Sequence, residues 1–220
     1  MPNPSLIAMQ EEEDAPAPSH MRLIGLSGFK GAGKDTVCEL IAQECENVVR
    51  RAFADKLKVI AGRSLGYEGE DVEIITAMNL LKNQGYVDSV ISSGVGTHLS
   101  GRRYLQLFGQ RAREVFGHSF WVDQVLPDPA INVESPVLQH KLFRCFDHAA
   151  VGVVTDVRYP GEAWRVRALG GEVWVVERPD LTSDGHDSER PLDDSLIDGV
   201  LINDGSKEDL RAHVRRLLNV

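Results

Sequence analysis

Short apolar runs alternate with amphipathic stretches along most of the chain. Runs rich in aliphatic and β-branched residues are typical of strands buried on both faces, and five are present: Arg22–Ser27, Val48–Ala54, Val151–Thr155, Glu172–Glu177 and Val200–Ile202. Apolar residues at helical spacing follow, over Lys34–Glu46, Asp55–Leu65, Pro160–Leu169 and Ser206–Leu218. Strands separated by helices pair in parallel through right-handed crossovers. The pattern therefore predicts a three-layer α/β/α fold around a five-stranded parallel sheet.

The segment 66–147 interrupts this alternation between the second and third predicted strands. It is charged, and its apolar spacing predicts helices over Asp71–Lys82, Arg102–Phe116 and Phe120–Leu126. Ser92–Gly96 consists mostly of serine and glycine, which predicts a flexible loop. We therefore expect a helical insertion within the α/β domain.

Residues 1–20 differ from the rest of the chain. They contain four prolines and an acidic run over Glu11–Asp14, and their apolar residues follow neither helical nor strand spacing. Such a composition is typical of a disordered segment. We expect a tail that is dispensable for chemistry, followed by one domain over 21–220.

Composition excludes several classes of protein. The 220 residues suffice for one sizeable core, and neither an apolar run of roughly 18 residues nor a secretory leader is apparent. Three cysteines without a Cys-x-x-Cys pair fit neither a disulfide framework nor a zinc site. A net charge of −9 argues against a protein that wraps nucleic acid, although a local anion pocket remains compatible with it. We expect a soluble intracellular protein with no membrane or nucleic-acid partner.

The strongest chemical signal is a glycine-rich loop between the first predicted strand and the first predicted helix. Gly28–Lys34 matches G-x-x-x-x-G-K, the phosphate-binding P-loop. Glycines let consecutive backbone N–H groups face phosphate oxygens, and the helix N-terminus adds partial positive charge. Lys34 then bridges the outer phosphates. We predict ATP binding by this loop and the residues just after it: Gly28, Lys30, Gly31, Ala32, Gly33, Lys34, Asp35 and Thr36.

The position after the lysine departs from the usual motif. Asp35 stands where Ser or Thr is common, and the hydroxyl follows at Thr36. Adenylate-kinase-like enzymes also place the threonine second, so the order favours a small-molecule kinase over a switch GTPase. We predict that Thr36 is the protein ligand of Mg²⁺ and that water completes the coordination shell.

Further segments narrow the assignment: Phe53–Lys58, Arg103–Gly109 with Phe120–Val122, Thr155–Glu162, His186–Glu189 and Asn203–Ser206. Together with the loop they resemble the bacteriophage deoxynucleoside monophosphate kinases and, more distantly, the dephospho-coenzyme A kinases, over Met21 to the C-terminus. The resemblance implies a cytoplasmic enzyme, in the host cytoplasm if the protein is viral, that transfers the γ-phosphoryl group of Mg·ATP to a deoxynucleoside monophosphate (dNMP). The insertion would close over this acceptor and exclude water. A homodimer is left open.

Three residues are predicted to be catalytic: Lys34, Arg158 and Asp55. Arg158 follows the third strand and so emerges at the same sheet edge as the P-loop, where it would stabilise the transferring phosphoryl group. The alternative is a surface residue at a helix start. Asp55 would orient or deprotonate the acceptor phosphate, or cap the next helix, or do both.

The remaining candidates bind the two substrates. Acceptor-binding residues are predicted to be Asp55, Lys58, Gln106, Arg111, Arg113, Trp121, Asp156 and Glu189. Arginine forks suit a monophosphate, but the family usually has Gly-Thr-Glu where this chain has Gly-Gln-Arg at 109–111. Trp121 would stack on the acceptor base or anchor the insertion in the core. Asn203 and Gly205 would meet adenine, although the same turn forms without a ligand.

Two alternative functions stay open, and a third is rejected. A kinase for another small acceptor, such as dephospho-coenzyme A, would need a pocket for pantetheine. A regulatory P-loop module would bind ATP without acceptor-dependent turnover. Hydrolase chemistry at Ser188 is rejected, because no nucleophile-elbow pattern surrounds it.

Overall fold

The structure is a computed structural model that describes residues 21–90, 96–129, 141–142, 144–181 and 191–220. Its main sheet has five parallel strands in the order β2-β5-β1-β6-β7. The strands are β1 (Arg22–Ser27), β2 (Val48–Arg51), β5 (Val151–Val154), β6 (Glu172–Glu177) and β7 (Gly199–Ile202). The five predicted strands and their parallel pairing are confirmed.

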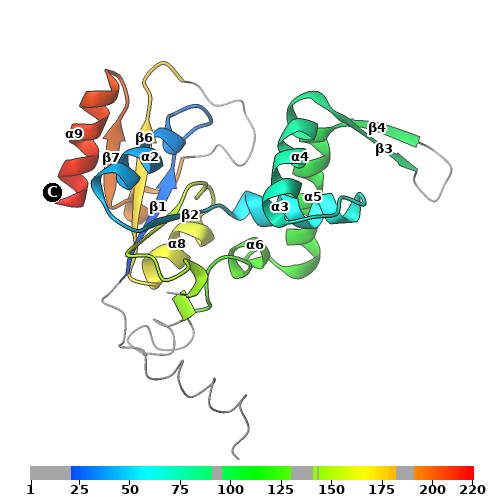
Figure 1. Cartoon of the computed structure of the whole chain (residues 1–220), viewed down its shortest axis with the longest axis horizontal. Coiled ribbons are helices and arrows are strands. Elements are labelled where there is room, and N and C mark those ends of the chain that lie inside the picture. The colour runs from blue at the N-terminus through cyan, green and yellow to red at the C-terminus, as the bar shows by residue number, and fades with distance from the viewer. Residues whose placement is uncertain (1–20, 91–95, 130–140, 143, 182–190) are drawn as a thin grey trace, which may run out of the picture.

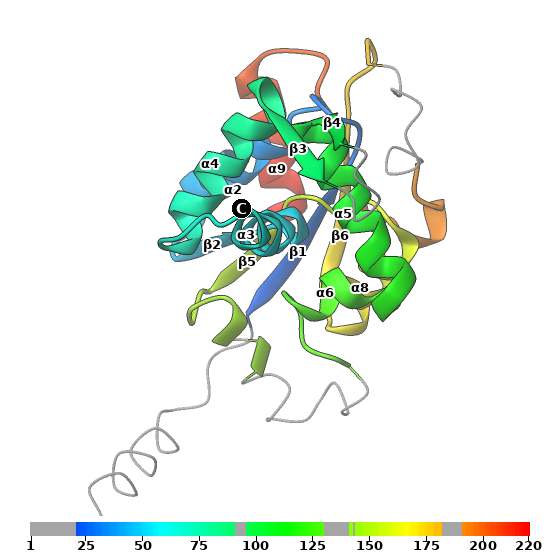
Figure 2. The ribbon, with the colours of Figure 1, turned by 90° about the vertical axis from the view of Figure 1, so that its right-hand side faces the viewer.

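Helices cover both faces of this sheet (Figure 2). On one face, Ile24 of β1 is buried with Val37 of α2 (Lys34–Glu44) and Val214 of α9 (Lys207–Leu218). On the other face, Leu23 is buried with Val166 of α8 (Pro160–Ala168). Successive residues of a strand point to opposite faces, so β1 supplies both cores. A short 3₁₀ helix, η2 (Asp194–Leu196), precedes β7. The predicted α/β/α layering is confirmed.

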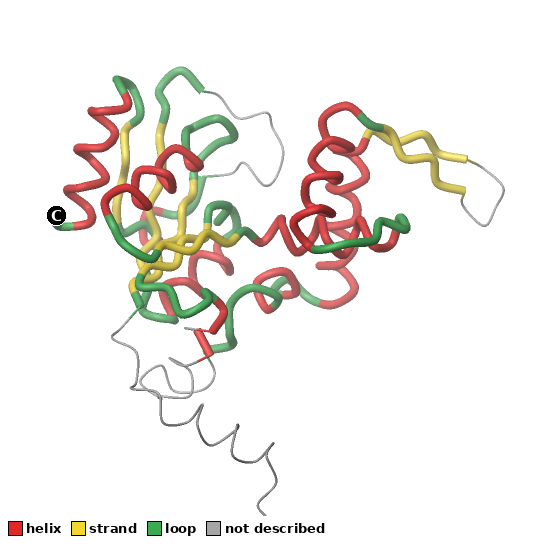
Figure 3. The backbone as a smooth tube through the Cα atoms, viewed as in Figure 1, coloured by secondary structure: helices red, strands yellow, loops and turns green. Residues whose placement is uncertain are grey.

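The insertion stands beside the sheet (Figures 1 and 3). It consists of α3 (Phe53–Ser64), which precedes the predicted start at residue 66, together with α4 (Asp71–Gln84), β3 (Tyr86–Val90), β4 (Gly96–Ser100), α5 (Gly101–Phe116) and α6 (Phe120–Asp123). Its first three helices share a small core of Ala61, Ile74, Met78 and Leu105. α6 joins the larger core through the buried Trp121, so the insertion is anchored in the body of the protein.

An antiparallel hairpin between α4 and α5 was not predicted. Strands β3 and β4 pair from Tyr86 with Ser100 to Val90 with Gly96 and extend away from the sheet (Figure 1). The prediction of a mostly helical segment is wrong here, because neither strand forms an apolar run: β3 contains Asp88 and Ser89, and β4 contains His98. Of the predicted Ser92–Gly96 loop, residues 92–95 lie outside the described residues, and Gly96 begins β4.

The predicted second strand is too long at its end. β2 stops at Arg51 and α3 begins at Phe53, so Asp55 lies in the first helical turn. The tail over 1–20 lies outside the described residues. Among the helices that the structure describes, none has the length and apolar character to span a bilayer.

Candidate active site

The P-loop has a backbone that only glycine accommodates at two positions. Gly28 and Gly33 have φ values of 127° and 107°, in the left-handed region that favours glycine. A Cβ atom at Gly28 would clash with the carbonyl oxygen of Val176, and one at Gly33 would lie 2.5 Å from Nδ2 of Asn203. The loop thus packs tightly between β6 and the end of β7, and α2 begins directly after it.

Lys34 is held against the inside of this loop. Its Nζ donates to the carbonyl oxygens of Gly28 and Phe29 at 2.7 and 2.8 Å. The glycine-shaped backbone, the lysine and the N-terminus of α2 together fit a phosphate chain. Thr36 is half-buried in the first turn of α2, while the Asp35 side chain is 85% exposed. Among the described residues, no three His, Cys, Asp or Glu side chains are grouped to hold a metal ion. Thr36 remains the predicted protein ligand of Mg²⁺, an ion that usually keeps several waters.

Asn203 contacts the P-loop itself. Its side-chain amide donates to the carbonyl oxygen of Ala32 at 2.8 Å, so the end of β7 supports the loop. This contact was not predicted, since Asn203 was expected to face adenine. Gly205 lies just before Ser206, whose hydroxyl caps α9.

A cavity of about 450 Å³ lies beside the P-loop, and we call it the P-loop cavity. Its wall combines side chains from the P-loop, α3, α4, α5 and the turn before α8. Six lining residues are cationic: Lys30, Lys58, Lys82, Arg102, Arg113 and Arg158. Three are carboxylic: Glu114, Asp156 and Glu162. The excess of cations suits a ligand with several negative charges.

Lys82 shows how close these cations are. Burial lowers the pKa of its ammonium group, and the nearby charges of Lys58, Arg102, Arg158 and Lys30 lower it further. Four cations from other parts of the chain therefore act on the charge of Lys82 within the cavity.

Asp156 caps α3. Its two carboxylate oxygens accept from the backbone N–H groups of Phe53 and Ala54, both at 2.8 Å. Burial raises the pKa of Asp156, and these two hydrogen bonds oppose the shift. The capping role considered for Asp55 is therefore wrong, because Asp156 performs it from β5's end.

Asp55 instead forms two ion pairs. Its carboxylate accepts from Lys58 at 2.8 Å and from Arg50 at 2.9 Å. Burial favours the neutral form, but the hydrogen bonds and charges of Lys58 and Arg50 outweigh it and lower the pKa. Asp55 is thus an ionised group that fixes Lys58, whose side chain is only 12% exposed, in the cavity wall.

Glu162 links α5 to the turn that carries Arg158. One carboxylate oxygen accepts from the backbone N–H groups of Arg158 and Tyr159 at 2.7 and 3.0 Å. The other lies 3.5 Å from the Arg113 guanidinium, which also stacks 4.4 Å above the Tyr159 ring. Burial, with the charge of Asp156 second, raises the pKa of Glu162 to about 7.

The structure brings seven of the predicted residues together in one cavity, while Asp55 lines a second cavity described below. Those lining the P-loop cavity are Lys30, Lys58, Gln106, Arg113, Trp121, Asp156 and Arg158. Arg111 does not line it; the side chain is 74% exposed and pairs with Glu114 on the same helix. Glu189 and the surrounding loop lie outside the described residues.

Trp121 is a core residue. It is 1% exposed, and its indole N–H donates to the carbonyl oxygen of Gly109 at 3.0 Å. Phe108 and Phe120 pack against its ring. The geometry therefore favours the anchoring role over the predicted stacking on a base, because a buried ring presents no free face.

Several cavity residues were missed by sequence reasoning, namely Lys82, Arg102, His118, Tyr159 and Glu162. Glu162 belongs to the Thr155–Glu162 segment that was singled out, so its presence at the site could have been inferred. Lys82 and Arg102 belong to no motif, and only the folded packing of α4 against α5 reveals them.

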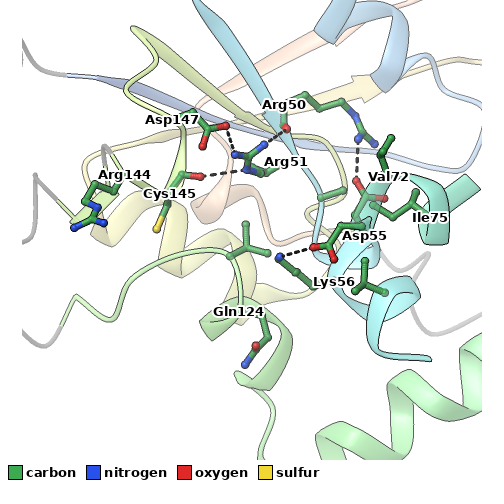
Figure 4. Close-up of a pocket in the computed structure, with 14 residues that line it drawn as sticks. Arg50, Arg51, Asp55, Lys56, Val72, Ile75, Gln124, Arg144, Cys145 and Asp147 are labelled. Carbon is green, nitrogen blue, oxygen red and sulfur yellow. Dashed lines mark hydrogen bonds and ion pairs between the residues drawn. The ribbon is translucent and has the colours of Figure 1, made fainter. Parts of the chain in front are cut away.

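A second cavity, of about 510 Å³, uses a different face of α3 and differs in charge (Figure 4). Its three acids are all paired: Asp55 with Arg50, Asp71 with Lys56, and Asp147 with Arg51. Among its described lining residues, Arg144 is the one cation outside these pairs. Because its charges are largely neutralised and it does not include the P-loop, the P-loop cavity is the better candidate.

Comparisons with known proteins agree with this chemistry. No family model matches the chain. A protein of Acanthamoeba polyphaga mimivirus named "putative deoxynucleotide monophosphate kinase" is 28% identical over 203 residues, which cover 88% of this chain and 94% of that protein.

Two solved structures align over most of the chain at low similarity. TT1252 from Thermus thermophilus is 17% identical with a TM-score of 0.40, over 91% of this chain and 98% of that one. Dephospho-CoA kinase from Campylobacter jejuni is 14% identical with a TM-score of 0.41, over 91% and 97%. Similarity at this level carries no functional argument. The mimivirus relative and the P-loop together support a kinase-like protein.

Proposed function

We propose that the protein is a deoxynucleoside monophosphate kinase that transfers the γ-phosphoryl group of Mg·ATP to a dNMP. The observation that carries the proposal is the position of the P-loop at the edge of a cavity lined by six cations. A donor phosphate chain on the loop and an acceptor phosphate in the cavity would then meet at Lys30 and Arg158. The sequence similarity to the mimivirus relative supports the choice of acceptor.

The chain's residues would act mainly by positioning and by charge stabilisation. The P-loop N–H groups and Lys34 hold the donor phosphates, and Arg158 stabilises charge on the transferring group. An acceptor phosphate oxygen attacks the γ-phosphorus, and the bond to the oxygen shared with the β-phosphate breaks, which gives a dNDP and ADP. Mg²⁺, near Thr36, supplies charge neutralisation when bound.

Asp55 orients rather than deprotonates in this scheme. A phosphate monoester loses its second proton with a pKa of about 6, so at neutral pH it needs no base. The ionised Asp55 already holds Lys58 at 2.8 Å. We assign Asp55 the task of fixing Lys58 toward the acceptor.

The test is ADP formation from Mg·ATP with each of the four dNMPs, the four ribonucleotides and dephospho-coenzyme A. We expect turnover with at least one dNMP and a loss of about 100-fold or more in Lys34→Ala, because the lysine stabilises charge formed in the transition state. Lys207→Gln on α9, a residue that does not line the P-loop cavity, is the control.

Two outcomes would contradict the proposal. Turnover with dephospho-coenzyme A alone would move the assignment to that kinase. ATP binding without turnover of any acceptor would favour a regulatory P-loop module.

A further inference from the structure

The second cavity lies between the insertion and the edge of the main sheet. Side chains from α3 and α4 line it on one side, and side chains from β2 and from the segment just before β5 line it on the other (Figure 4). The same helix, α3, also lines the P-loop cavity: Lys56 and Val59 face the second cavity, whereas Leu57 and Lys58 face the P-loop cavity. A molecule in the second cavity would therefore contact the insertion and the sheet edge together, across α3 from the P-loop.

The second cavity has an apolar wall. Val59 and Val125 contribute to it from the core, at 5% and 8% exposure, and α4 adds the half-buried Ile75 and the exposed Val72. An apolar group placed against this wall would remove the surface of Val72 and Ile75 from water, which is favourable. The volume of about 510 Å³ lies in the range that holds small organic ligands.

The charged lining residues leave one cation in excess. Four cations and three acids line the cavity, and each acid pairs with one of the cations as described above. The fourth cation, Arg144, is exposed, and within the described part of the chain it forms neither a hydrogen bond nor an ion pair. A ligand with a single negative charge would balance this excess, and a carboxylate matches the planar fork of a guanidinium group.

We propose that the second cavity is a binding site for a small organic monoanion, with an apolar body and one carboxylate, and that its occupation inhibits the kinase. The apolar body lies against Val72 and Ile75, and the carboxylate pairs with Arg144. The effect on turnover rests on the proposed function, whereas the binding site itself does not.

Inhibition follows from the position of α3 between the two cavities. The expected closure of the insertion over the acceptor moves α3 and α4 relative to the sheet. A ligand that contacts both α4 and the sheet edge stabilises the arrangement described here and opposes that movement. Asp55 adds a direct connection, because its carboxylate accepts from Arg50 in the wall of the second cavity and from Lys58 in the wall of the P-loop cavity.

The first experiment measures binding of anilinonaphthalene sulfonate (ANS), an aromatic monoanion that becomes fluorescent in apolar surroundings, to the full chain. We expect Arg144→Gln to weaken ANS binding about 10-fold, as for the loss of a charge-assisted hydrogen bond. Val72→Asn should weaken it about threefold to fivefold, because apolar contact is lost. Octanoate should displace ANS, whereas octanamide, which has the same length and no charge, should not.

Two variants serve as matched controls. Arg216→Gln removes an exposed arginine on α9, and Val115→Asn changes a valine on α5 that is 71% exposed. Neither residue lines either cavity, so both variants should bind ANS as the wild type does. Because Arg144 and Val72 are exposed, Arg144→Gln and Val72→Asn should also keep the wild-type Tm.

Turnover assays with a dNMP and Mg·ATP test the inhibition. Octanoate should lower kcat and leave the KM of each substrate unchanged, because neither substrate uses the second cavity. Arg144→Gln should need about 10-fold more octanoate for the same inhibition, and without octanoate it should have the wild-type kcat and KM.

The site, its effect on turnover and the proposed function fail in different ways. Equal ANS affinity in the wild type, Arg144→Gln and Val72→Asn would overturn the site. Inhibition that added ATP or dNMP relieves would mean that the anion binds in the P-loop cavity, and it would overturn the inhibitory role. A wild type that turns over no dNMP would overturn the proposed function, while the ANS titration would still decide whether the site exists.

Discussion

Glu162 is a titratable residue that is almost completely withdrawn from water. It is 4% exposed and sits among Asp156, Arg113, Arg158 and the Tyr159 ring, from α5, the end of β5 and the turn before α8. Two backbone N–H groups and one distant guanidinium do not fully replace the lost hydration, so its pKa rises to about 7. Ionisation of Glu162 therefore acts against the folded state.

This predicts a specific pH dependence of stability. The folded pKa of about 7 lies above the ordinary value of 4.5, so the stabilising contribution of Glu162 is complete below about pH 4.5 and is lost as the pH rises through 7. Between pH 5 and pH 8 the wild type should lose about 2 kcal/mol more of its free energy of unfolding than Glu162→Gln does. Urea unfolding at both pH values measures the difference.

The exposed Glu208 on α9 supplies the control for this measurement. Its side chain is 75% exposed, so Glu208→Gln should follow the wild-type pH dependence. If Glu162→Gln also follows it, then Glu162 does not titrate differently in the folded and unfolded chains.

The sequence predicted some residues of the candidate site and not others. Lys34 and its glycines follow from the motif, because the chemistry of phosphate binding fixes their spacing. Lys82 and Arg102 could not be predicted, since lysines and arginines on amphipathic helices are usually solvated. Their convergence in one cavity depends on how α4 packs against α5, which no local pattern records.

At the scale of elements, the end of β7 and the P-loop form one unit. The amide of Asn203 donates to Ala32 and closes on the space where a Gly33 side chain would lie. This contact orients the loop without touching a nucleotide base. We therefore expect Asn203 to support phosphate binding through the loop. A side chain that contacted only adenine would not affect the binding of phosphate groups.

Asn203→Ala should weaken the binding of ATP and of tripolyphosphate by the same factor. A lost hydrogen bond of about 1 kcal/mol corresponds to roughly fivefold for both ligands. Competition against a fluorescent nucleotide, with Mg²⁺ present throughout, measures both affinities. The adjacent Asp204→Ala is the control. Weaker binding of ATP alone would show that Asn203 reads adenine and that support of the loop is secondary.

Elements with an apolar run or a helical period were predictable, and the hairpin was not. The five strands of the main sheet are rich in aliphatic residues, and the long helices have apolar residues at helical spacing. The β3–β4 hairpin has neither signal, because polar residues such as Asp88, Ser89 and His98 interrupt its strands. The end of β2 depends on Asp156, a residue 103 positions beyond Phe53, whose carboxylate starts α3 where the sequence predicted a strand.

At the scale of the whole molecule, local and global charge have opposite signs. The chain carries a net charge of −9, whereas the P-loop cavity has six cations against three carboxylates. A dNMP is a dianion at neutral pH, so it is repelled by the molecule as a whole and attracted by the cavity. Which field controls its capture depends on distance, because salt screens charges beyond about 10 Å at 0.1 M.

The direction in which added salt changes kcat/KM shows whether the net charge of the molecule or the charge of the cavity controls capture of the dNMP. If the net charge dominates, kcat/KM for dNMP should rise with added NaCl, because screening relieves the repulsion. If the cavity dominates, as its excess of cations over carboxylates indicates, kcat/KM should fall several-fold between 0.05 and about 0.5 M NaCl. Initial rates at saturating ATP and fixed Mg²⁺, measured over this range of NaCl, give the salt dependence of kcat/KM.

The double variant Lys82→Gln, Arg102→Gln should show a weaker decrease of kcat/KM with salt, since fewer cations remain to be screened. A wild-type kcat/KM that rises with salt would mean that these cations do not draw the acceptor into the cavity.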